Sequence, residues 1–278
     1  MKYRDIEYDC LIFDVDNVLI DTSLSFPCVI RTAIQVSWRE LFMGKVDGIA
    51  FTWDHFRTMK QYPYFNDDYD IAWILLDIAA SNNLDRNLVK SFPSIETLNG
   101  ILQNYHGENL EGWMERNFGI HISRNTVRKL CAELYYGRAV FKKITGKEPS
   151  FVKCPGFWRR ERPLLNRHWK DLGLPVGIYT GRFHEEYVLA LDLLNWQDLP
   201  PEYAVTADSG ILKPSPEGLS MICSQLGSCK PLYFGDAESD RQSLLNLGYG
   251  NFIAIGDVVR GSGFRFNNLE EAFRELGI

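Results

Sequence analysis

Short runs of apolar residues that stop at polar or acidic residues recur in two separate parts of the chain. The first is Tyr8–Asp14, in which β-branched and aromatic residues run into an acidic segment. A short, continuous apolar run of this kind is typical of a strand that is buried on both faces. Four similar runs occur late in the chain: Leu174–Thr180, Tyr203–Thr206, Pro231–Gly235 and Asn251–Gly256.

Between the late runs lie segments with the length and periodicity of helices. They are Arg159–Leu172, His184–Trp196, Pro216–Leu226 and Ser239–Leu247. Strands that alternate with helices form right-handed crossovers, which produce a parallel sheet covered by helices on both faces. The prediction is therefore an α/β fold with a doubly wound parallel sheet, whose ligands bind beyond the carboxyl ends of the strands.

Residues 22–156 have a different pattern, because long helix-like stretches follow one another without strand alternation. The predicted helices are Phe26–Phe42, Tyr69–Ser81, Ser94–Tyr105, Leu110–Phe118 and Ser123–Ile144. Connectors rich in Gly, Pro, Asn and Asp separate several of them. We expect an all-helical domain, residues 22–156, inserted into an α/β domain formed by residues 1–21 and 157–278.

Composition and charge narrow the class of protein. Of 278 residues, 45% are hydrophobic, which is typical of a globular chain. The sequence contains no apolar stretch of the roughly 20 residues that a membrane span needs, and its start resembles neither a signal nor a transit peptide. A formal net charge of −6 argues against nucleic acid as the main partner. We expect a cytoplasmic monomer or homodimer without membrane or nucleic-acid partners.

Acidic residues crowd the ends of two predicted strands. Asp14 and Asp16 lie two positions apart after the first strand, so an extended backbone would point both carboxylates to one side. Two aspartates at this spacing, without other motifs, more often belong to a solvated turn. Three acids, including Asp236 and Asp240, follow the strand Pro231–Gly235, where oxygen ligands for a hard cation would be suitable. Helix capping explains one of these acids but not three.

Hydroxyl and basic groups follow the other predicted strands. Thr180 and Gly181 come where a helix should begin, and a hydroxyl with free backbone N–H groups can cradle phosphate oxygens there. Arg182 comes next and is a candidate substrate-binding residue. Thr and Gly are also ordinary capping residues at a helix start. Lys213 stands in a proline-rich connection, where its ammonium group could offset anionic charge or simply be solvated.

These four segments resemble, in order, the four motifs of the haloacid dehalogenase-like (HAD) superfamily. The motifs are Asp-x-Asp-x-Val, a hydrophobic run that ends in Thr, Lys-Pro, and Gly-Asp-x-x-x-Asp. They lie within residues 6–21 and 157–278, and the helical insert resembles the C1-type cap of subfamily I. Phosphoglycolate phosphatases and β-phosphoglucomutases belong to that group. The resemblance implies a HAD-like Rossmannoid core with a helical cap.

The resemblance also implies a Mg²⁺-dependent phosphomonoester hydrolase that acts on a small phosphorylated metabolite. Asp14 would be the nucleophile that forms an aspartyl phosphate, and Asp16 the general acid and then the base. Thr180 and Lys213 would hold the phosphoryl oxygens.

By the same resemblance, the carboxylates of Asp14 and Asp236, the backbone carbonyl of Asp16 and water would bind Mg²⁺. Asp240 would act through water or by orienting another ligand.

Two alternatives use the same fold. A phosphomutase shares the covalent chemistry and is not separated from a hydrolase by these motifs. A non-catalytic, phosphate-binding regulatory protein is expected to lack Asp14, Lys213 or Asp236, and all three are present. Dehalogenases lack the second aspartate of the first motif, so Asp16 argues against dehalogenation.

The first motif departs from the superfamily at Asn17, where Gly is most common. The turn there is expected to need a left-handed residue, and Asn tolerates that conformation better than most other residues. We therefore expect the geometry of the turn to be preserved.

Overall fold

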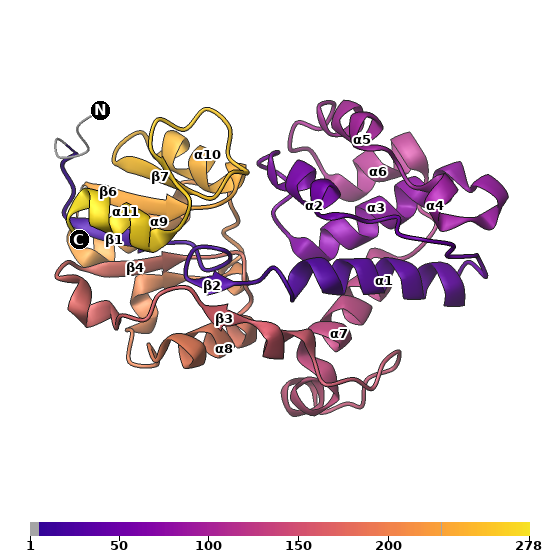
Figure 1. The fold of residues 1–278 in the computed structure, drawn as a ribbon, viewed down its shortest axis with the longest axis horizontal. Helices are drawn as coiled ribbons and strands as arrows, with labels where there is room; N and C mark the ends of the chain where they lie inside the picture. Colours follow the sequence, from indigo (N-terminus) through magenta and orange to yellow (C-terminus); the bar gives the residue numbers. More distant parts are fainter. Residues whose placement is uncertain (1–5, 229) are drawn as a thin grey trace. The chain divides into compact units, whose positions relative to one another are not determined.

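The computed structural model describes residues 6–228 and 230–278. Contacts between Cα atoms divide the chain into two compact units (Figure 1). One, the sheet unit, comprises Met1–Thr22 and Arg162–Ile278, and the other, the helical unit, comprises Ser23–Glu161. The domain boundaries expected from the sequence fall after residues 21 and 156, and residues 157–161 lie in the helical unit.

A six-stranded parallel sheet forms the centre of the sheet unit. Its strand order is β5-β4-β1-β6-β7-β8, and every neighbouring pair is parallel. The strands are β1 (Cys10–Phe13), β4 (Val176–Tyr179), β5 (Ala204–Val205), β6 (Pro231–Gly235), β7 (Asn251–Ile255) and β8 (Arg265–Phe266). All five predicted strands are present, whereas the two-residue β8 was not predicted.

Helices cover both faces of this sheet. They are α8 (His184–Leu194), α9 (Glu217–Leu226), α10 (Glu238–Leu247) and α11 (Leu269–Leu276). Alternate residues of β1 serve opposite faces, because Leu11 and Phe13 join one buried cluster while Cys10 and Ile12 join another. Helices α8 and α11 pack on the first cluster, and α9 and α10 on the second. The predicted doubly wound α/β fold is thus confirmed.

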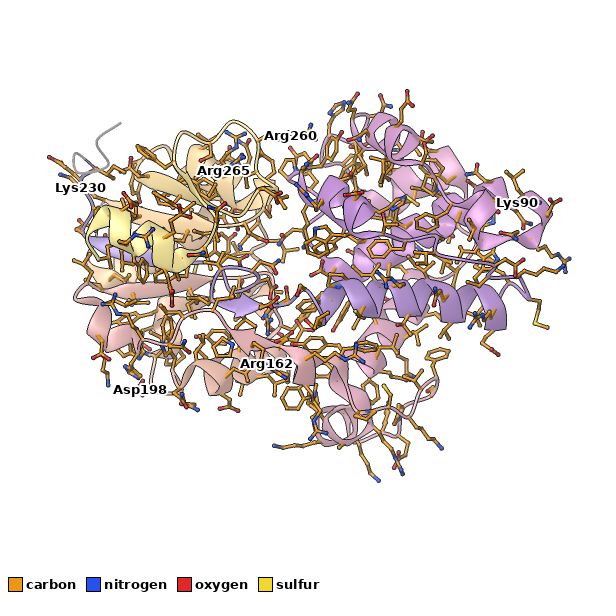
Figure 2. The ribbon with its side chains drawn as sticks, in the orientation of Figure 1. Lys90, Arg162, Asp198, Lys230, Arg260 and Arg265 are labelled. Carbon is orange, nitrogen blue, oxygen red and sulfur yellow. The ribbon has the colours of Figure 1, made fainter. Side chains whose placement is uncertain are left out.

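The predicted helix Arg159–Leu172 is wrong. The segment contains a short strand flanked by two 3₁₀ turns: η3 (Phe157–Arg160), β3 (Arg162–Pro163) and η4 (Trp169–Leu172). Pro163 lacks an N–H donor and disfavours helical backbone at the preceding residue, Arg162, which Figure 2 labels. Strand β3 instead pairs antiparallel with β2 (Ile20–Asp21).

Three long helices pack together in the helical unit: α1 (Phe26–Glu40), α3 (Asp68–Asn82) and α7 (Arg124–Thr145). Residues 69–80 of α3 are all buried, because its sequence is apolar on nearly every side. The shorter helices are α2 (Trp53–Lys60), α4 (Leu88–Ser91), α5 (Ile95–Leu102) and α6 (Leu110–Phe118); a 3₁₀ turn, η2 (Leu84–Arg86), precedes α4. The sequence predicted all of these α-helices except α2 and α4.

No helix among the described residues is both long enough and apolar enough to cross a membrane.

Asp77 is the more deeply buried of two buried carboxylates in α3, the other being Asp70. Asp77 is fully buried, and its Oδ1 accepts the backbone N–H groups of His121 at 2.8 Å and Ile122 at 3.2 Å. Burial raises the pKa of Asp77 to about 6, against the opposing effect of these hydrogen bonds. The ionised form is therefore disfavoured in the folded protein.

We expect Asp77→Asn to remove a pH dependence of stability. Because the folded-state pKa is raised, the contribution of Asp77 is greatest below its ordinary pKa and is lost as the pH rises through about 6. The free energy of unfolding of the wild type, relative to the variant, should fall by up to ~3 kcal/mol from about pH 4 to about pH 7. Urea denaturation of both proteins over this pH range measures the difference. Plots of unfolding free energy against pH that run parallel for the two proteins would contradict the prediction.

Candidate active site

Three of the four predicted motif segments follow neighbouring strands. Asp14 follows β1, Thr180 follows β4 and Asp236 follows β6. These strands are adjacent and parallel in the order β4-β1-β6, so their carboxyl ends share one edge of the sheet. Such an edge is where ligands of open α/β sheets bind. Strand order thus brings together residues that are far apart in the sequence.

Lys213 places a buried positive charge at this edge. Its Nζ lies 2.8 Å from Oδ1 of Asp14 and 2.6 Å from Oδ1 of Asp240, and its side chain is 1% exposed. Burial acts to lower the pKa of Lys213, but the two carboxylates hold it above its usual value. The lysine is therefore a charged partner of the acidic motifs and not a solvated surface residue.

Negative charge is in excess around Asp14. Burial raises the pKa of Asp14 to about 7; Lys213 opposes this rise, whereas Asp240 and Asp16 add to it. Carboxylate oxygens of Asp14, Asp236 and Asp240 lie within 4.8 Å of one another. Hard oxygen donors at this spacing suit a divalent cation such as Mg²⁺, which would relieve the repulsion between the acids. The donor set therefore fits a divalent cation, which the family resemblance implied.

Two buried tyrosines support the lysine and Asp240. Nζ of Lys213 lies 5.3 Å from the ring centroid of Tyr179 and 5.9 Å from that of Tyr233, within the range of cation–π attraction. The Tyr233 hydroxyl donates to Oδ1 of Asp240 at 2.7 Å, and the N–H of Ala237 donates to Oδ2 at 3.0 Å. Nothing in the sequence marked these tyrosines, because aromatic residues are common in buried strands.

Arg182 is buried and contacts Asp16. Its Nε and Nη2 lie 2.8 Å and 2.7 Å from Oδ1 of Asp16, and Nη1 donates to the backbone oxygen of Glu186 at 3.1 Å. Oγ1 of Thr180 accepts the N–H of Arg182 at 3.2 Å, while Gly181 is exposed at the same turn. The sequence suggested Arg182 as a substrate-binding residue, and in the structure its guanidinium group is directed at Asp16.

Two other ion pairs of the sheet unit lie at the surface. Lys230 pairs with Glu7, and Asp198 pairs with Lys170. Figure 2 labels Lys230 and Asp198. Solvent and salt screen exposed pairs of this kind, which therefore contribute little to stability. The pairs around Lys213 are buried, and buried clusters of titratable groups with shifted pKa values are typical of functional sites.

The sheet and the cluster at its carboxyl edge define an α/β enzyme with a buried aspartate–lysine site. A family profile for haloacid dehalogenase-like hydrolases matches residues 8–248. The chain therefore belongs to the haloacid dehalogenase-like hydrolases.

Several solved structures share the fold. Phosphatase Tt82 from Thermococcus thioreducens is 21% identical, with a TM-score of 0.64 over 97% of this chain and 100% of that chain. A candidate phosphoglycolate phosphatase from Lactobacillus delbrueckii subsp. bulgaricus is 19% identical, with a TM-score of 0.55 over 99% of both chains. A hydrolase from Pseudomonas syringae is 11% identical, with a TM-score of 0.52 over 97% of this chain and 98% of that chain. A search of curated protein sequences gave no match.

Tyr233→Phe tests the support of Asp240, because it removes the hydroxyl donor and keeps the ring beside Lys213. A hydrogen bond to a charged acceptor contributes ~1.5–3 kcal/mol, so the free energy of unfolding in urea should fall by about that much. The matched control is Tyr187→Phe in α8. Tyr187 is buried, and its hydroxyl has no hydrogen-bond partner among the described residues, so little or no loss is expected. Equal losses in both variants would contradict the assignment.

Proposed function

We propose that the protein is a phosphomonoester hydrolase that uses Asp14 as the nucleophile on a small phosphorylated metabolite. One observation carries the proposal: the Asp14 carboxylate is 2.8 Å from the buried Lys213 ammonium and shares an oxygen cluster with Asp236 and Asp240. A carboxylate can approach an anionic phosphate readily only where positive charge is concentrated. The lysine supplies part of this charge, and a cation held by the oxygen cluster would supply the rest. Membership in a hydrolase family supports the reaction class.

The reaction has two steps. In the first, a carboxylate oxygen of Asp14 attacks phosphorus, the bond from phosphorus to the leaving oxygen breaks, and Asp16 gives that oxygen a proton. In the second, Asp16 takes a proton from water as the water oxygen attacks phosphorus, which frees Asp14 and releases inorganic phosphate. Arg182, whose Nη2 is 2.7 Å from Oδ1 of Asp16, would keep Asp16 oriented for both proton transfers.

Groups at the end of β4 and in the loop that carries Lys213 would hold the phosphoryl oxygens. The Thr180 hydroxyl, the Gly181 N–H and the Lys213 ammonium are the proposed contacts. The buried Lys213 side chain supports this role, because its charge is already fixed in place before a phosphate arrives. We assign the Arg182 guanidinium group to Asp16, so its part in substrate binding would be indirect.

The proposed cofactor is Mg²⁺, held by the carboxylates of Asp14 and Asp236, the backbone carbonyl of Asp16 and water. When bound, the ion would neutralise charge on the phosphoryl oxygens and on the attacking carboxylate. Asp240, which Tyr233 and Ala237 hold in place, would orient the site or bind through water.

The helical unit is the proposed cap, which would select the substrate. All of the proposed catalytic and metal-binding residues belong to the sheet unit, so the proposed chemistry assigns no role to a side chain from residues 23–161. We further propose a cytoplasmic location and a monomeric or homodimeric state.

Metal removal should abolish phosphate release. We expect EDTA to stop turnover and Mg²⁺ to restore it better than Ca²⁺, because Ca²⁺ prefers more ligands and longer bonds. Asp236→Ala should imitate metal loss, whereas Asp198→Ala, at an exposed position of the same unit, should not. A panel of phosphorylated metabolites assayed for released phosphate measures this. Undiminished turnover in EDTA would overturn the metal assignment.

Substitutions of the two aspartates of the first motif should impair the reaction in different ways. Asp14→Asn removes the nucleophile, so turnover should cease for every substrate. Asp16→Asn removes the proton transfers, each typically worth about 10²–10⁴-fold, and should stop the hydrolysis of alkyl phosphates. With p-nitrophenyl phosphate the leaving group departs unprotonated, so this variant should release a burst of nitrophenol and retain phosphate on Asp14.

Mass spectrometry of the trapped protein, with hydroxylamine cleavage, locates the phosphate. Turnover by Asp14→Asn, or a phosphate on any other residue, would overturn the nucleophile assignment.

A further inference from the structure

We propose that Asn17 is a positioning residue that orients the metal ligand Asp236 through its side-chain amide. The residue does more than adopt the left-handed backbone conformation of the turn. This inference rests on the proposed metal site. It concerns the position where the first motif of this chain departs from the glycine expected from the resemblance.

The backbone around Asn17 forms a tight turn after β1. Asn17 has φ of +55°, which confirms the left-handed conformation expected from the sequence. Its N–H donates to the backbone oxygen of Ile20 at 2.7 Å. The backbone N–H groups of Leu19 and Ile20 both donate to the backbone oxygen of Val15 at 2.9 Å. Glycine would adopt this conformation at least as easily. The backbone therefore gives no reason for asparagine in place of glycine.

The side chain supplies that reason. Nδ2 of Asn17 donates to Oδ2 of Asp236 at 2.9 Å, and Oδ1 of Asn17 accepts the hydroxyl of Thr22 at 3.0 Å. The backbone N–H of Thr22 lies 3.4 Å from the same oxygen. Thr22 is buried, with 1% of its surface exposed. The donors of Thr22 hold the carbonyl end of the amide, so its NH₂ end faces Asp236.

This contact prepares Asp236 to bind a cation. A carboxylate has about four lone-pair sites, so the oxygen that accepts the Asn17 amide leaves other positions for the metal. Asp236 is only partly buried. The Asn17 amide fixes one of its oxygens before a cation binds, which lowers the ordering cost of binding. Residues that orient metal ligands typically contribute about 10–100-fold to metal affinity. Glycine at position 17 could not supply such a donor.

The experiment is Mg²⁺ binding by isothermal titration calorimetry without substrate, on the wild type, Asn17→Gly and Thr22→Val. We expect Asn17→Gly to bind Mg²⁺ at least ~10-fold more weakly. Thr22→Val keeps the amide donor but removes its hydroxyl anchor, and should weaken binding by a smaller factor. In phosphate-release assays, the half-saturating Mg²⁺ concentration should rise by the same factor as the dissociation constant for Mg²⁺. The kcat at saturating Mg²⁺ should stay within about twofold of the wild type.

The matched control is Asn195→Gly. Asn195 also has a left-handed backbone, with φ of +56°, but it is an exposed residue at the end of α8 in the same unit. It reports the effect of the same substitution on stability alone, and its Mg²⁺ affinity should match the wild type. Thermal melts of all four proteins identify any variant that is not folded, and Thr22→Val tests the inference if Asn17→Gly does not fold.

The outcomes separate the two proposals. Wild-type affinity in folded Asn17→Gly, or in Thr22→Val when that is the only folded variant, overturns the role of Asn17 and leaves the metal site standing. A wild type that binds no Mg²⁺ overturns both proposals. A loss of affinity confined to Asn17→Gly and Thr22→Val supports the inference.

Discussion

The burial of several carboxylates beside one ammonium group is the constraint on which the site depends. Taking ionised groups out of water is unfavourable unless partners compensate closely. Lys213 compensates Asp14 and Asp240, and Tyr233 and the N–H of Ala237 add hydrogen bonds to Asp240. These groups come from separate strands and loops, so none of them can hold the cluster alone. The cluster therefore exists only when the sheet has formed in its native strand order.

The same constraint explains a local feature of the sequence. Gly235 ends β6, and a Cβ at this position would lie 2.4 Å from Cβ of Asp240. No larger residue fits there unless α10 shifts away from the strand. The glycine thus allows Asp240 to reach Lys213 and Tyr233. In this segment, backbone packing and the geometry of the acidic cluster both require glycine at position 235.

The fold was predictable where burial leaves a local pattern. Strand β1 is buried on both faces, so its unbroken apolar run identified it without knowledge of its neighbours. The segment Arg159–Leu172 misled the prediction because helix-like spacing continued across Pro163, whose backbone restriction overrides that spacing. Strand β8 has only two residues, and its conformation depends on pairing with β7, which no local pattern records. Prediction therefore failed where distant contacts or one backbone restriction decided the structure.

The position of the candidate site was predictable from strand ends, but the partner of each side chain was not. A guanidinium group suits a phosphate or a carboxylate equally well. The contact between Arg182 and Asp16 joins two loops, and the two residues are 166 positions apart in the sequence. Asn17 shows the same limit more sharply. Its conformation is a local property, which the sequence predicted, whereas its contact with Asp236 spans 219 positions. The amide of Asn17 thus couples the first and fourth motifs physically, and a glycine at this position would lack that contact.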